Sequence, residues 1–329
     1  MSGTDVVVTG VGRVSADGFD FRTALGRRGY KYLPSATQYL LAAARRALAD
    51  AGPEALEAAG PERRGAAVGT NSAAVALHHA MDGTVTGTGA EGLSPLTAPY
   101  FSINLFGSRL ATEHDLKGFN LTLTTPRVAG FEALRTGRRA LAAGRAGLLI
   151  AGATEEALPE DEPGADTSEA GAVALLLEPA DSLAARGGRA LGRLDIRTLF
   201  LPPRLAASGE GTDRAAALVR DALDALGHRP DAPLTTTAVL DGSPVGEAVA
   251  AALENVTGDG KPELVPAGAG ALEPVARAAA ALDGDPGRTH AVLTAAAEGH
   301  LAVCLVTPGD TGAGADGQPT STPRRADDR

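Results

Sequence analysis

Residues 120–130, with the sequence Asn-Leu-Thr-Leu-Thr-Thr-Pro-Arg-Val-Ala-Gly, have the pattern of a strand, a tight turn and a helix. Alternating leucines and threonines predict the strand, the Thr-Pro pair forces the turn, and apolar residues at helical spacing follow. Such a turn presents one side chain at a helix N-terminus, where free backbone N–H groups and the helix dipole can activate a nucleophile. The residue presented here is Arg127. An arginine side chain stays protonated at any working pH and cannot be the nucleophile.

Histidines are the next candidates for chemistry. His78 and His79 fall on a helix predicted for residues 73–81, where adjacent side chains point about 100° apart, so they cannot chelate a metal ion together. With no third ligand nearby, we expect a solvated helix face and no metal site. His300 is expected to be a turn histidine.

The single cysteine and an early pair of glycines give little support for catalysis or cofactor binding. Cys304 lies in the apolar run 300–306, which predicts a buried strand thiol. Gly10 and Gly12 suggest a tight turn after the first apolar run, but the third glycine and the helix of a dinucleotide fingerprint are missing. We therefore expect no cofactor.

The overall composition restricts the partners. The chain of 329 residues has a formal net charge of −10 and no basic cluster, which argues against nucleic acid and anionic membranes as partners. No apolar run approaches the roughly 20 residues of a membrane span, and the N-terminus leads directly into a strand-like run at Val6. We expect a cytoplasmic protein.

Apolar runs alternate with amphipathic segments, which predicts strands alternating with helices in two successive sets. We expect two α/β halves, at residues 1–160 and 161–308, and a disordered tail at residues 309–329, where apolar residues are almost absent. A segment rich in glycine and threonine, residues 83–92, is expected to be a loop. The predicted strands cover residues 6–9, 65–70, 121–124, 146–152, 169–178, 189–198, 235–240, 290–294 and 300–306. The predicted helices cover residues 35–51, 73–81, 100–111, 128–141, 180–186, 213–226, 244–254 and 272–282.

With its elements in this order, the chain resembles the β-ketoacyl synthases of the thiolase fold over nearly its whole ordered length. The motifs that carry the resemblance include Val6-Val-Val-Thr-Gly-Val-Gly-Arg-Val-Ser15, Gly118-Phe-Asn-Leu-Thr-Leu-Thr-Thr125, Gly144-Arg-Ala-Gly-Leu-Leu-Ile-Ala-Gly-Ala-Thr-Glu155 and Glu169-Ala-Gly-Ala-Val-Ala-Leu-Leu-Leu-Glu178. The resemblance implies an α/β, thiolase-like fold. Two stacked βαβαβ-type halves with mixed sheets would form layers in the order α-β-α-β-α.

The resemblance does not extend to the catalytic residues of the family. Its nucleophile motif, Thr-Ala-Cys-x-x-Gly, matches residues 125–130, so Arg127 stands at the cysteine position. The first catalytic histidine matches Asp241, and the region that matches the second, residues 263–273, contains no histidine. A condensing enzyme needs a thiolate to hold the acyl group and two histidines to promote decarboxylation and stabilise the enolate oxygen. No catalytic residue is therefore expected in this chain.

The resemblance implies a non-catalytic ketosynthase-like subunit, similar to the chain length factors of type II polyketide systems. Such a subunit forms a heterodimer with an active ketosynthase, shapes the tunnel that receives the growing chain, and meets the acyl carrier protein only indirectly. The predicted helix 100–111 would line the tunnel near the dimer interface. The residues expected to form the tunnel or the interface are Phe101, Leu105, Phe106, Thr125 and Arg127.

Two other functions stay open. An acyltransferase or hydrolase could have moved its nucleophile to Thr124, Thr125 or Ser168, although the sequence places no histidine near them as a base. A structural homodimer or scaffold is the other alternative. Arg127 also has two interpretations. It could donate hydrogen bonds to a carbonyl, a carboxylate or a partner, or the site could have closed so that it reaches solvent or an acid such as Asp241.

Overall fold

The computed structural model of the chain describes residues 5–229, 232–256 and 260–309. The strands are β1 (Val6–Ser15), β2 (Arg64–Gly69), β3 (Asn120–Leu123), β4 (Leu148–Glu155), β5 (Gly171–Pro179), β6 (Gly192–Phe200), β7 (Leu234–Leu240), β8 (Glu263–Pro266), β9 (Thr289–Ala295) and β10 (His300–Pro308). The α-helices are α1 (Phe21–Ala24), α2 (Ser35–Ala51), α3 (Val75–Thr88), α4 (Leu105–Glu113), α5 (Ala129–Ala142), α6 (Ala180–Ala185), α7 (Pro203–Ala206), α8 (Gly211–Ala225), α9 (Pro244–Val256) and α10 (Leu272–Ala281). Within these ranges no helix has the length and apolar character needed to cross a membrane.

The ten strands of the described residues form a mixed sheet in the order β3-β2-β4-β5-β1-β6-β10-β9-β7-β8. Read outward from the centre, the two halves of this order are the same, with β1 to β5 corresponding to β6 to β10. In each half the first strand is antiparallel to the last, and the second strand is parallel to both of its neighbours. Within the sheet, the two halves are linked by the pairing of Val8 on β1 with Gly192 on β6. The sheet therefore consists of two five-stranded units with the same topology.

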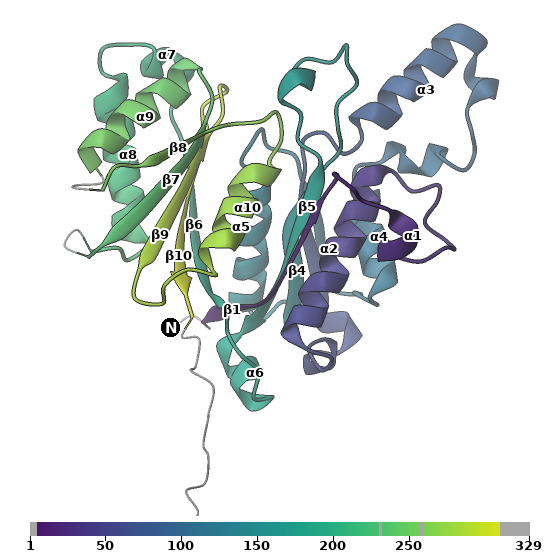
Figure 1. The fold of residues 1–329 in the computed structure, drawn as a ribbon, viewed down its shortest axis with the longest axis horizontal. Coiled ribbons are helices and arrows are strands. Elements are labelled where there is room, and N and C mark those ends of the chain that lie inside the picture. The colour runs from purple at the N-terminus through teal and green to yellow at the C-terminus, as the bar shows by residue number, and fades with distance from the viewer. Residues whose placement is uncertain (1–4, 230–231, 257–259, 310–329) are drawn as a thin grey trace, which may run out of the picture.

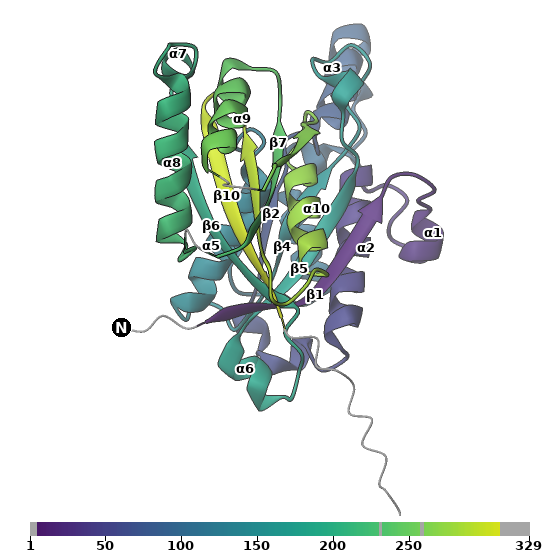
Figure 2. The same ribbon diagram turned by 60° about the vertical axis from the view of Figure 1, so that its left-hand side comes forward.

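Helices cover both faces of each half-sheet and create five layers (Figures 1 and 2). Helices α2 and α4 pack on the outer face of the first half, and α8 and α9 on the outer face of the second. Helices α5 and α10 lie between the halves and share one core with strands of both. Because both faces of β4 and β5 are covered, almost every residue in these strands is buried, which explains their continuous apolar runs. The predicted α/β architecture with mixed sheets in alternating layers is confirmed.

The predicted domain limits relate to this architecture in different ways. The division of the chain at residue 160 stays a prediction, and strand pairing places β5 with the N-terminal strands β1 and β4. The predicted disordered tail at residues 309–329 lies outside the described residues, except for Gly309.

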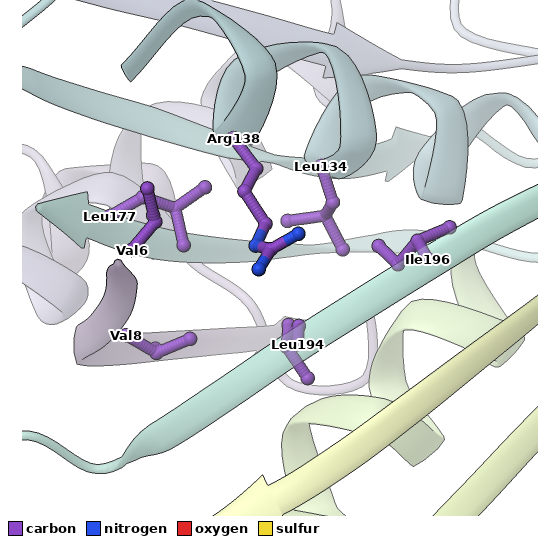
Figure 3. Close-up of a pocket in the computed structure, with 7 residues that line it drawn as sticks. All are labelled: Val6, Val8, Leu134, Arg138, Leu177, Leu194 and Ile196. Atoms are coloured by element: carbon purple, nitrogen blue, oxygen red, sulfur yellow. The ribbon is translucent and has the colours of Figure 1, made fainter. Parts of the chain in front are cut away.

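A small apolar cavity of about 10 Å³ lies where the two halves meet (Figure 3). The guanidinium of Arg138, on α5, projects among aliphatic side chains from β1, β5 and β6, and it forms an ion pair with Asp195 on β6. This volume is at the lower limit for a single water molecule. We interpret the cavity as a packing gap beside an ion pair and not as a binding site. Its apolar lining consists of Val6, Val8, Leu134, Leu177, Leu194 and Ile196.

Two glycines in the middle of β1 allow the strand to lie directly on the backbone of α2. A Cβ atom on Gly12 would be 1.9 Å from the carbonyl oxygen of Ala43, and one on Gly10 would be 2.0 Å from that of Ala47. The predicted glycine turn is therefore wrong. The strand continues through both glycines to Ser15, and it is the close approach of α2 that requires them.

Replacing Gly12 with alanine is expected to lower the free energy of unfolding by about 1–3 kcal/mol, because β1 and α2 must move apart to accept the methyl group. Gly83 in α3 is the matched control, since nothing lies within 4 Å of a Cβ atom added there. Alanine is also the better helix former, so Gly83→Ala should leave stability unchanged or raise it by up to about 1 kcal/mol. Urea unfolding followed by circular dichroism measures both variants. Equal effects would contradict the packing argument.

Helix α3 projects from the layered body (Figure 1), and none of its residues is buried. It extends to Thr88, so the prediction of a loop over residues 83–92 is wrong for its first half. Three threonine hydroxyls in the last turns donate to the carbonyl oxygen four residues earlier: Thr84, Thr86 and Thr88. These local bonds accompany a helix in a segment whose composition favours a loop.

Candidate functional site

The predicted strand, turn and helix around Arg127 are present as β3, a five-residue turn (124–128) and α5. Arg127 has φ of 60°, a left-handed conformation that few residues other than glycine adopt. The side chain of Asn71, which follows β2, binds the backbone of this turn. Its Oδ1 accepts the backbone N–H of Arg127 at 2.9 Å, and its Nδ2 donates to the carbonyl oxygens of Thr124 at 3.1 Å and Thr125 at 3.3 Å. The turn thus keeps the geometry of a nucleophile elbow.

The side chain of Arg127 crosses to the second half of the molecule. Its Nη2 lies 3.0 Å from Oδ2 of Asp241, just after β7, and its Nη1 donates to the carbonyl oxygen of Gly268, just after β8. The two charged side chains are only 14% and 22% exposed. The ion pair predicted as one of two interpretations of Arg127 is therefore present. The structure brings together all three regions that the sequence marked as degenerate catalytic positions.

A cavity of about 310 Å³ opens beside this ion pair. Among the described residues, Arg127 is the only cationic one in its lining, and Glu298 in the β9–β10 hairpin adds an acid. Neither a cysteine nor a histidine is among these lining residues. The lining residues are Asn71, Thr124, Pro126, Arg127, Ala269, Ala296, Ala297 and Glu298.

The sequence profile described as "Beta-ketoacyl synthase, N-terminal domain" matches residues 4–180, more than half of the chain. The chain belongs to the beta-ketoacyl synthase family. No curated protein matches it in sequence. The family assignment made from the motifs is confirmed.

Solved structures share the fold of this ketosynthase-family chain at low sequence identity. One is a type II polyketide synthase ketosynthase in complex with its acyl-carrier protein, AntDE:AntF, with a TM-score of 0.73 and 17% identity. Another is the ishigamide ketosynthase/chain length factor, with 0.74 and 22%. A third is a beta-ketoacyl synthase from Burkholderia phymatum STM815, with 0.75 and 15%. Each match covers 93% of this chain and 99% of the other. These likenesses confirm the predicted thiolase-like ketosynthase fold.

Two further carboxylates lie close to the site of this ketosynthase-family chain, and no sequence motif marked them. Glu155, at the end of β4, is fully buried. Its oxygens accept the backbone N–H groups of Asn71, Ser72 and Ala271 at 2.7–3.0 Å. Burial raises the pKa of this carboxyl group above its usual range. Glu155 therefore ties the loop after β2 to the start of α10.

Glu169 is the second carboxylate, and this residue is half-buried with its Oε1 atom enclosed. Its Oε2 accepts the backbone N–H groups of Leu272 at 2.7 Å and Glu273 at 3.1 Å, at the first turn of α10. Burial raises the pKa of Glu169 to about 7. The available sequence signal was a glutamate directly next to an apolar strand at two places, Glu155 after one strand and Glu169 before the next.

The residues predicted for a tunnel or interface lie in different surroundings. The predicted helix 100–111 is divided, with a 3-10 turn at Ala98–Phe101 before α4. Phe106 is fully buried in the outer core, while Phe101 is 67% exposed and its ring lies 5.2 Å from that of His78. Leu105, which directly precedes Phe106, is half-buried. Of these three residues, Phe106 belongs to the core and Phe101 lies on the surface.

A second cavity of about 310 Å³ lies between the start of α2 and the segment before α4. Tyr100 lines it together with Tyr32, while Glu156 contributes a carboxylate whose pKa is raised by burial. Tyr100, at the start of the predicted tunnel helix, therefore lines this cavity. The other lining residues are Lys31, Leu33, Pro34, Ser35, Ala76, Leu77 and Thr97.

Two of the three hydroxyl groups considered as relocated nucleophiles, those of Thr125 and Ser168, have structural partners. The Thr125 hydroxyl donates to Oε2 of Glu132 at 2.5 Å, within the first turn of α5. Ser168 Oγ accepts the backbone N–H of Leu158 at 2.8 Å. Among the described residues, no hydrogen bond links a histidine to these hydroxyls or to that of Thr124.

The remaining candidate side chains are distant from any catalytic arrangement. Cys304 on β10 is fully buried, and burial raises the pKa of its thiol above the usual range, as expected for a strand thiol in the core. His300 begins β10 and packs edge-on against Phe200, with ring centres 5.6 Å apart. His79 on α3 faces Glu162 at 3.4 Å. Across the described ranges, no cluster of three or more metal-binding side chains occurs.

Proposed function

We propose that this chain is a non-catalytic ketosynthase-like subunit that pairs with an active ketosynthase, in the manner of a chain length factor. The observation that carries the proposal is the ion pair between Arg127 and Asp241 at the elbow. In this arrangement the position of the thiol nucleophile and that of the first histidine are occupied by residues that neutralise each other. The loop at the third position contributes the carbonyl oxygen of Gly268, which accepts a hydrogen bond from Arg127.

The chemistry of condensation supports the same conclusion. Acyl transfer requires a nucleophile with an adjacent base, and decarboxylation requires donors aimed at the developing enolate oxygen. The described residues that line the cavity beside Arg127 supply neither a thiol nor an imidazole. A subunit that contributes only shape to a tunnel can lose these groups while it keeps the elbow and the surrounding sheet.

An open edge of the sheet is the surface that we propose for the partner. Among the described strands, the edge strand β3 pairs only with β2, and such an edge can pair with a strand of another subunit. Leu121 on this strand is 37% exposed. Three further exposed apolar side chains belong to α3 and to the segment before α4, namely Val85, Leu96 and Phe101. The cavity lined by Tyr100 would then form part of the acyl tunnel.

Co-expression with a ketosynthase that keeps an intact cysteine and two histidines tests the proposal. We expect a one-to-one heterodimer by multi-angle light scattering. Leu121→Asp should weaken the complex by at least about tenfold, because it places a charge on the paired edge. Leu264→Asp is the matched control, since Leu264 is 56% exposed on the opposite edge strand β8. A stable homodimer that binds no ketosynthase would refute the proposal.

Incubation with acyl-loaded carrier protein separates this proposal from an enzyme with a relocated nucleophile. We expect no covalent acyl group on the purified chain by intact-mass spectrometry. An acyl adduct that disappears in Thr125→Val, where the hydroxyl next to Glu132 is lost, would establish the enzyme instead.

A further inference from the structure

The loop 267–271, between β8 and α10, rests on two carboxylates. Glu155 accepts the backbone N–H of Ala271 at 2.8 Å, and Glu169 accepts the next two N–H groups at the start of α10. The second oxygen of Glu169, Oε1, is buried and has no hydrogen-bond partner. The two acids therefore hold one short segment of backbone between them.

Glycines bring this loop into direct contact with both acids. A Cβ atom on Gly268 would lie 2.5 Å from Oε1 of Glu169, and one on Gly270 would lie 2.7 Å from Oε2 of Glu169 and 2.8 Å from Cγ of Glu155. No side chain of the loop separates its backbone from the carboxyl groups at these positions. A change in the charge of either acid therefore acts directly on the loop.

The loop in turn positions the elbow side chain. The carbonyl oxygen of Gly268 accepts a hydrogen bond from Arg127, and Ala269 lines the cavity beside it. The backbone N–H of Ala269 donates to the carbonyl oxygen of Thr167, two residues before Glu169. A displacement of the loop would thus move one of the two anchors of Arg127 and change the shape of the cavity.

The charges around Glu169 oppose its ionisation. Glu155 from β4 and Glu273 from α10 are both acidic, and Arg277 on α10 pairs with Glu273 at 2.7 Å. The N-terminus of α10 favours negative charge, but Glu155 already supplies a carboxylate there. With burial as the main cause and the charge of Glu155 as a smaller one, the pKa of Glu169 is raised to about 7.

We propose that the protonation state of Glu169 controls how firmly the loop 267–271 is held. With a proton on Glu169, the loop keeps its hydrogen bonds to the two acids and to Arg127. Loss of the proton places two carboxylates on either side of Gly270, so they repel each other and loosen the loop. The pairing of the chain with another subunit is not needed for this behaviour, so the inference stands apart from the proposed function.

Hydrogen exchange of the segment 267–273 tests whether Glu169 controls the loop. After correction for the intrinsic pH dependence of exchange, we expect protection of this segment to fall by about tenfold between pH 6 and pH 8, because the ionised-to-protonated ratio of a group with a pKa near 7 rises about a hundredfold over this range. Glu169→Gln should keep its protection at both pH values. Glu160→Gln, at an exposed glutamate, is the control and should behave as the wild type.

A measurement on the unaltered protein removes any dependence on how the variants fold. Carbon-13 chemical shifts of glutamate carboxyl groups should contain one resonance, absent in Glu169→Gln, that titrates near pH 7, and the amide shifts of the loop should change with the same midpoint. A midpoint below pH 5 for Glu169 would overturn the proposal. Equal loss of protection in the wild type and Glu169→Gln would also overturn it.

Discussion

Replacing Arg186 with alanine is expected to lower the free energy of unfolding by about 3–5 kcal/mol, because it leaves a buried carboxylate without its counter-ion. Glu178 on β5 has no exposed surface. Its oxygens accept Nη2 and Nε of Arg186 at 2.7 and 3.1 Å, and the Thr9 hydroxyl on β1 donates to Oε1 at 2.6 Å. The network joins β1, β5 and the segment that leads to β6. Urea unfolding followed by circular dichroism gives the measurement.

An exposed ion pair in the same region provides the control. Arg193 pairs with Asp5, and the two side chains are 43% and 56% exposed, so Arg193→Ala should change stability by no more than about 1 kcal/mol. Replacing both members of the buried pair, Glu178→Leu with Arg186→Leu, should recover most of the loss, since no buried charge then remains. The argument fails if Arg186→Ala is as mild as Arg193→Ala.

The ion pair at the elbow should show a clear coupling energy. Arg127→Ala and Asp241→Asn are each expected to lower the free energy of unfolding by about 1.5–3 kcal/mol, since each removes a charged hydrogen bond in a largely buried site. The double variant should lose less than the sum, by about 0.5–3 kcal/mol, because the two changes break the same contact. A thermodynamic cycle from urea unfolding of the four proteins provides the test.

Backbone conformation gives a second check on Arg127. Its φ of 60° suits glycine, so Arg127→Gly should be more stable than Arg127→Ala by about 1 kcal/mol. Lys117→Ala is a control for charge removal, because Lys117 and Asp115 form a pair with both side chains more than half exposed. A coupling energy near zero between Arg127 and Asp241 would mean that their contact does not stabilise the fold.

Local patterns were sufficient to predict the elbow. The alternation before Thr125, the Thr-Pro pair and the helical spacing after Arg127 are all short-range signals, and they define β3, the turn and α5. The contact between Arg127 and Asp241 joins residues 114 positions apart. No periodicity in the sequence encodes such a contact. It was predicted, as one of two possibilities, because the family resemblance placed both residues at one site.

Other features depended on packing that the sequence does not express. Gly10 and Gly12 were interpreted as a turn because glycine is ambiguous between a positive φ and a close approach, and only the position of α2 distinguishes the two. The opposite environments of Phe101 and Phe106 follow from the change from a 3-10 turn to α4 between them. The inward positions of Glu155 and Glu169 were missed because acids are usually exposed, and the backbone donors that satisfy them come from distant parts of the chain, the loop after β2 and the start of α10.

The position of the elbow ion pair has a consequence for how such a chain can evolve. Arg127 belongs to the loop after β3 and Asp241 to the loop after β7, so the pair links the two topological repeats of the fold. Replacing Arg127 with cysteine would leave Asp241 without its cation, and replacing Asp241 with histidine would set an imidazole against a guanidinium. Either single change is therefore expected to give a less stable protein. Under the proposed non-catalytic function, a return to the catalytic residues of the family would require coordinated changes in both repeats.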